Sequence, residues 1–269
     1  MKLKIILSVI FATIIFVVLM LLCETLVFQS EILPNSVSTP VRFVIYGFLS
    51  LALTVIIVYA FCYFLKDNVR ILGLKGRKWH SNFIKGALTG IFCIIVGLSI
   101  IYIFGNINIQ KTPARWSFIS TYFLMAVFLA ISEELFFRGF LQNQFTKIAK
   151  PFWAIIFTSL IFVVLHGSNS DVTLISLINI FVISIFLGFS FYGTKNLYFP
   201  IGFHIFWNVT QAFFGFSVSG DAVPSFFEIT YKNENIINGG NFGFEGSIIC
   251  TIIILVLITF MIVRKFLHK

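Results

Sequence analysis

Charged side chains are scarce in this sequence of 269 residues, at 11%, whereas 59% of the residues are hydrophobic and the mean hydropathy is +1.01. Soluble domains carry roughly 25% charged residues, so this composition excludes an ordinary soluble globular protein. A bilayer crossing needs about 20 apolar residues, and runs of that kind recur along the chain. The sequence predicts an all-α, polytopic transmembrane helix bundle with about eight membrane helices, at residues 5–28, 41–65, 83–104, 117–138, 152–170, 174–192, 197–214 and 246–264.

Cysteine is also rare, and the pattern His-Glu-x-x-His, typical of many zinc peptidases, is absent. The first apolar run follows two lysines and resembles a signal peptide. It is too long and lacks a small-residue cleavage site, so we expect it to stay as a membrane anchor. The four cysteines lie within or beside apolar runs, without the spacing of a zinc or redox motif, and are predicted to be inert packing residues: Cys23, Cys62, Cys93 and Cys250.

The net charge of +9 is explained better by membrane topology than by one basic binding face. Basic residues lie in short connections and at the termini, which argues against a nucleic-acid partner. By the positive-inside rule, the basic connections at 66–85, at 147–150 and at Lys195 lie in the cytoplasm. We expect an integral membrane protein with cytoplasmic N- and C-termini. The abundance of Phe, Ile, Asn and Lys favours a bacterial plasma membrane.

The chain is predicted to form a single membrane domain, 1–269, in three parts. Residues 1–115 supply the first three helices, residues 116–214 form a core with the polar clusters, and residues 215–269 supply an outer loop and the last helix. Gly86 and Gly90 can bring two helix backbones close together. The Gly- and Asn-rich stretch 215–245 is a lid or a flexible loop, and we favour the loop.

Three short polar clusters interrupt the apolar runs of the core. The first contains Glu133, Glu134 and Arg138, and a charge in the middle of a membrane helix costs about 2.5–3.5 kcal/mol on the insertion scale. Residues four apart share a helix face, so Glu134 and Arg138 are predicted to form an ion pair. Glu133 points elsewhere and is left free to act as a general base.

The other two clusters are Phe162 with His166, and His204 with Asn208. Each cluster alone has a structural explanation, because a buried ion pair or an interhelical hydrogen bond would account for it. Together, a free carboxylate, two imidazoles and an amide are the groups needed to activate water and to stabilise an oxyanion. The sequence therefore predicts a hydrolytic site whose catalytic residues are Glu133, Glu134, Arg138, His166, His204 and Asn208.

These clusters resemble the CPBP family of intramembrane proteases, which includes enzymes of the CAAX prenyl protease 2 type and bacterial immunity-type proteins. The family patterns Glu-Glu-x-x-x-Arg, Phe-x-x-x-His and His-x-x-x-Asn occur in order, and the resemblance covers roughly residues 117–214. It implies that Glu133 with His166 activates water and that His204 with Asn208 stabilises the oxyanion. Arg138 and Glu134 would hold the site in shape.

The family is often described as metalloproteases, so the resemblance leaves two mechanisms open. Glu133, His166 and His204 would be the ligands of a Zn²⁺ ion with a water in its open position. A glutamate-activated water assisted by an amide and imidazoles needs no metal, and we favour that mechanism.

The predicted function is an intramembrane endopeptidase, CAAX protease-like, that hydrolyses a peptide bond of a hydrophobic peptide or membrane-protein substrate in a cavity open to the cytosol. The alternative is a non-catalytic bacteriocin-immunity or scaffold membrane protein, against which the complete residue set argues. A transporter using Glu133 and Glu134 as a proton relay ranks last, because no repeated architecture is visible. One difficulty is depth: His166 lies about 22 Å along a helix that begins at Pro151, whereas straight membrane helices would place Glu133 and His204 nearer the cytosolic face.

Overall fold

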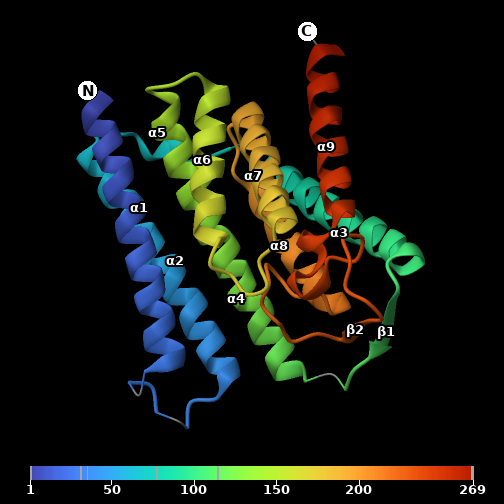
Figure 1. Cartoon of the computed structure of the whole chain (residues 1–269). Helices are drawn as coiled ribbons and strands as arrows, with labels where there is room; N and C mark the ends of the chain where they lie inside the picture. Colours follow the sequence, from blue (N-terminus) through green and yellow to red (C-terminus); the bar gives the residue numbers. More distant parts are fainter. Residues whose placement is uncertain (1, 31, 35, 77, 114, 268–269) are drawn as a thin grey trace.

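The computed structural model describes residues 2–30, 32–34, 36–76, 78–113 and 115–267, and Figure 1 shows them as a bundle of helices. All eight apolar runs coincide with helical segments, so the prediction of an all-α polytopic bundle is confirmed. The helices are α1 (Lys2–Glu24), α2 (Thr39–Phe64), α3 (Trp79–Phe104), α4 (Trp116–Glu134), α5 (Asn143–Thr146), α6 (Pro151–His166), α7 (Leu174–Thr194), α8 (Tyr198–Phe214) and α9 (Ile248–Leu267). A π-helical segment, Leu135–Gln142, joins α4 to α5 without a break.

Five helices of the described chain are long and apolar enough to cross a membrane: 2–29, 39–64, 79–104, 116–146 and 174–194. Helix α6 and residues 248–263 are apolar but shorter. Helix α6 ends at His166, before the expected 170, because polar residues follow Gly167. Large apolar side chains such as Phe92 (66% exposed) and Val164 (74% exposed) project from the outer faces, as expected for surfaces in contact with lipid. The protein is an integral membrane protein.

The chain begins and ends at the same end of the bundle (Figure 1). The opposite end holds the α1–α2 connection and a two-stranded antiparallel sheet, β1 (Ile107–Lys111) with β2 (Phe227–Tyr231). The sequence did not predict these strands. They tie the segment that follows α8 to the connection between α3 and α4.

The prediction of a flexible loop at 215–245 is wrong, because this segment folds back into the bundle. Phe216, Phe242 and Phe244 are at most 1% exposed. Asn238 donates from Nδ2 to the Gly105 carbonyl oxygen at 2.7 Å. Buried aromatic rings and a buried amide hold this segment in place, where a Gly- and Asn-rich composition suggested a flexible loop.

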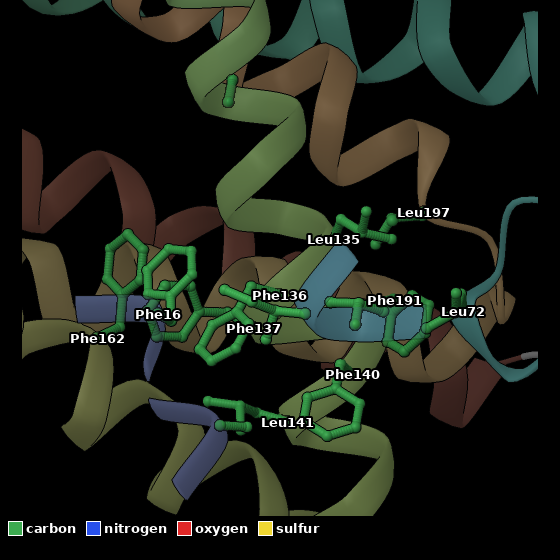
Figure 2. Close-up of a cluster of buried hydrophobic side chains, with 14 of the residues drawn as sticks. Phe16, Leu72, Leu135, Phe136, Phe137, Phe140, Leu141, Phe162, Phe191 and Leu197 are labelled. Carbon is green, nitrogen blue, oxygen red and sulfur yellow. The ribbon is translucent and has the colours of Figure 1, made fainter. Parts of the chain in front are cut away.

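The π-helical segment after Glu134 lies at the centre of the bundle, and all of its residues are buried. Phe136 stacks on Phe16 of α1 with ring centroids 4.0 Å apart, and Phe137 packs edge-on against Phe162 of α6 at 4.9 Å. Figure 2 shows these rings on one side of the segment, with Leu72, Phe191 and Leu197 on the other. Helices distant in sequence thus pack around the turn that follows the acidic pair.

Helices α3 and α8 are in backbone contact through glycines. A Cβ on Gly86 would lie 2.1 Å from the Phe199 carbonyl oxygen, and a Cβ on Gly202 would lie 2.3 Å from the Phe83 carbonyl oxygen. Close approach of this kind is the use that membrane helices make of small residues. Because His204 follows Gly202 by two residues, this contact sets the position of His204.

Replacing Gly86 by Ala should lower the stability of the folded protein by roughly 1–3 kcal/mol, because the methyl group has no room against the backbone of α8. The control is Gly193→Ala, since a Cβ at Gly193 of α7 meets nothing within 4 Å. Thermal unfolding in detergent micelles measures both variants. Equal melting temperatures for the two would contradict the close contact.

Candidate active site

The predicted ion pair between Glu134 and Arg138 is present and completely buried. Arg138 donates from Nη1 to Glu134 Oε1 at 2.9 Å, and both side chains are 0% exposed. Arg138 also donates from Nη2 to Ser184 Oγ at 3.0 Å, and its guanidinium carbon lies 4.8 Å from the centroid of the Phe162 ring. Arg138 therefore binds α4, α6 and α7 to one another. Ser184, an isolated hydroxyl in the apolar run of α7, was missed by the sequence analysis.

His204 lies between the two carboxylates of α4. Its Nδ1 is 2.9 Å from Glu134 Oε1, and its Nε2 is 3.9 Å from Glu133 Oε2. An ionised carboxylate can only accept, so the Nδ1 nitrogen carries the proton of the first contact. The other ring nitrogen is thereby directed toward Glu133, an arrangement in which a carboxylate fixes both the tautomer and the orientation of an imidazole.

Glu133 faces a cavity of about 440 Å³, and its side chain is 27% exposed. His166, His204 and Asn208 line the same cavity. The structure thus brings four of the predicted residues to one cavity, from three helices. The other two, Glu134 and Arg138, lie behind it in the buried pair.

The difficulty of depth disappears because helix α4 does not stop at the acidic pair. The helix continues through the π-helical segment and α5 to Thr146, so Glu133 lies about 20 Å from that end. Helix α6 begins at Pro151, close in sequence to Thr146, and His166 lies about 22 Å along α6 from Pro151. The two helices therefore carry Glu133 and His166 at a similar depth.

Phe162 explains why an aromatic residue precedes His166 by one turn. Its carbonyl oxygen lies 2.8 Å from His166 Nδ1, and a carbonyl can only accept, so Nδ1 donates. In the neutral ring, Nε2 is then the acceptor. The Phe162 ring meanwhile packs against Arg138, so one residue orients both a histidine and the ion pair.

Other residues on the cavity were not predicted as site residues. Asn169, just beyond α6, donates from Nδ2 to the Ser219 carbonyl oxygen at 2.9 Å, and both residues line the cavity. Glu24 and Asp221 line it as well. Burial raises the pKa of the Asp221 carboxyl, and a hydrogen bond with Ser170 opposes the rise. Asn169 lies three residues after His166, which is the sequence signal that could have identified it.

A zinc site made of Glu133, His166 and His204 does not fit the observed arrangement. Within the part of the chain that the structure describes, no group of three or more His, Cys, Asp or Glu residues is arranged to hold a metal ion. Glu133 and His204 are neighbours, but His166 shares only the cavity with them.

The cavity extends toward the end of the bundle opposite to the termini. Its lining includes Glu24 and Phe28 at the end of the first helix, Phe43 near the start of α2, and the segment 218–224 except Gly220. If both termini are cytoplasmic, as predicted, this is the outer half of the membrane. The cavity would then reach the side of the membrane opposite to the cytosolic opening that the sequence analysis expected.

The fold defines a polytopic membrane protein, and its site places acid–base side chains on a cavity between helices. The model of the Rce1-like family, type II CAAX prenyl endopeptidases, matches residues 115–210. This segment begins at the start of α4 and includes all three polar clusters, so the predicted resemblance to the CPBP and CAAX protease family is confirmed. The family that this segment resembles is described as one of endopeptidases. No curated protein matches the chain.

Removing the buried charge should be far more costly to folding than removing the charge on the cavity. Arg138→Ala leaves Glu134 buried and without its cation, and should lower the free energy of unfolding by about 3–5 kcal/mol. Glu133→Gln should change it by less than about 0.5 kcal/mol, since Glu133 is partly exposed. Unfolding in mixed micelles, followed by circular dichroism, compares the two. A similar loss in both variants would refute the division between buried and cavity-facing acids.

Proposed function

We propose that this protein is an endopeptidase that hydrolyses a peptide bond of a hydrophobic or membrane-associated substrate inside the bilayer. The observation that carries the proposal is the convergence of Glu133, His166, His204 and Asn208 on one cavity. The family match supports proteolysis as the reaction class. A protein that used its polar clusters for packing alone would have no need to direct them at a cavity.

Glu133 is assigned as the general base. It accepts a proton from water while the water oxygen attacks the carbonyl carbon of the substrate, and it later returns that proton to the leaving amine. His166 presents Nε2 as an acceptor that orients the same water. The side chain of Glu133 is suited to this role because Glu134, its neighbour, is already committed to Arg138 and His204.

Asn208 and His204 are assigned to the negative charge that develops on the carbonyl oxygen. Asn208 supplies an amide donor, and preorganised donors of this kind are a main source of catalysis in acyl transfer. His204 can donate from Nε2 while Nδ1 remains bonded to Glu134 only when the ring is an imidazolium. The Glu134 carboxylate, bonded to Nδ1, compensates that charge after Glu133 has accepted the proton of water.

The cavity also restricts the substrate. Its walls include Phe16, Met20 and Tyr122, which suit apolar side chains, and three carboxylates also line it: Glu24, Glu133 and Asp221. A CAAX substrate ends in a free carboxylate close to the bond that is cut. Like charges repel, so this cavity is better suited to a bond inside a hydrophobic peptide that is neutral or cationic near the cleavage site.

Proteolysis should depend on Glu133. In membranes containing the protein and small hydrophobic peptides, Glu133→Gln should lower the cleavage rate by about 10²–10⁴-fold, because it removes the proton acceptor. Glu228→Gln, at an exposed acid of β2, is the matched control and should retain the wild-type rate. Mass spectrometry of the products identifies the cut bond. A biological activity that survives Glu133→Gln would favour the immunity or scaffold function.

A negative charge on the substrate should slow cleavage, because the cavity is lined by acids. Peptides sharing one apolar core should be cut about fivefold faster with a C-terminal amide than with a free carboxylate, which corresponds to about 1 kcal/mol of repulsion at 4 Å in water. The difference should shrink as the pH falls, since burial raises the pKa of Asp221 and this acid becomes neutral sooner than an ordinary one. Glu24→Gln combined with Asp221→Asn should reduce it at neutral pH. A preference for the free carboxylate would oppose the assignment.

A further inference from the structure

Glu245 is a buried acid that takes no part in the mechanism above. It precedes α9 and is 4% exposed. Its Oε1 accepts from Trp207 Nε1 at 2.7 Å and from Gln211 Nε2 at 3.4 Å, and its Oε2 accepts from Ser219 Oγ at 2.8 Å. A buried carboxylate is costly unless donors of this kind surround it, so its retention calls for a physical reason.

The partners of Glu245 belong to the segments that carry the site. Trp207 lies on α8 between His204 and Asn208. Ser219 lines the large cavity and is bonded through its carbonyl oxygen to Asn169, just beyond the end of α6. One carboxylate therefore connects the helix of His204 with the chain that follows His166.

A second and smaller cavity lies beside the same residues. Its volume is about 30 Å³, and its polar lining comes from Glu245, Ser219, His166, His204 and Asn208. A water molecule needs about 10–15 Å³ and two to four polar partners, so the chamber has room for one or two waters. Both histidines, Asn208 and Ser219 line this chamber and the large cavity alike. The chamber is thus placed to supply water to the site.

We propose that Glu245 is a positioning residue of the hydrolytic site, which holds Ser219 against Trp207 and closes a water-sized chamber beside the two histidines. The proposal rests on the function proposed above and adds a residue from outside the matched segment 115–210. Glu245 acts through Trp207 and Ser219, since these are the side chains that it contacts in the cavity wall.

The main chain at Glu245 is fixed independently of its carboxylate. Asn179 of α7 donates from Nδ2 to the carbonyl oxygen of Glu245 at 2.7 Å and to that of Ser247 at 2.8 Å. Substitution of the side chain therefore leaves the course of the chain in place. This makes Glu245→Gln a readable test of what the carboxylate itself does.

Glu245→Gln should lower kcat by about 10- to 100-fold, as expected for a displaced catalytic geometry, with KM changed by less than about twofold. Glu234→Gln, at an exposed acid of the same segment, should match the wild type. Ser219→Ala breaks the same connection from the other side and should also lower kcat. An unchanged kcat in Glu245→Gln, or a fall in kcat explained by unfolding, would overturn the proposal.

Amide hydrogen exchange tests the connection without any substrate. In the full-length protein, Glu245→Gln should raise exchange at 167–170 and 216–222 and leave β1 unchanged, whereas Glu234→Gln should raise neither. If neither the wild type nor Glu133→Gln cuts any peptide, but Glu245→Gln still raises amide exchange at these two segments, the connection made by Glu245 stands and the proposed protease function fails. If the wild type cuts peptides and Glu133→Gln does not, while Glu245→Gln changes neither amide exchange nor kcat, the protease function stands and the positioning role of Glu245 fails.

Discussion

The contact between Glu134 and Arg138 is the interaction on which the rest of the site depends. Both charges are fully buried, so each can remain ionised only because the other is present. The pair then engages three more helices, because Ser184 and Phe162 hold Arg138 while His204 binds Glu134. Helix geometry turns Glu133, one residue away, from Arg138, and its carboxylate approaches the network at His204 Nε2, at 3.9 Å. A packing interaction thus determines which of two adjacent acids faces the cavity.

Much of this could be predicted from the sequence, since the relevant signals are local. Helix periodicity places Glu134 and Arg138 on one face, and apolar runs mark the helices. The site residues outside the matched segment could not be found in that way. Ser219 and Glu245 meet through a contact between segments distant in the chain, and a Gly- and Asn-rich composition suggested a flexible loop where the structure has a folded segment. Local composition does not report which buried partners a polar residue will meet.

Under the proposed function, the large cavity would hold the substrate and the small one would hold water. The large one has aromatic walls and acids, and the small one is bounded by Trp207, Ser219 and Glu245. Four side chains face both, so the reacting groups stand at the boundary between an apolar space and a polar one. Hydrolysis within a bilayer requires such a boundary, because the peptide enters the site from the lipid, whereas the water that attacks it must be held in a polar space separate from the lipid.

In the π-helical segment, the number of residues matters to the site as much as their identity. On its C-terminal side, Gln142 donates to the Gly188 carbonyl oxygen at 2.9 Å and Asn143 donates to the Ile71 carbonyl oxygen at 2.7 Å. Deleting one residue between these amides and the acids would turn the two sets of side chains by about 100° relative to each other. The carboxylates and the amides could not then all keep their partners. Variation in this stretch should therefore be confined to substitutions, and a change of even one residue in its length would put the helix out of phase with the site.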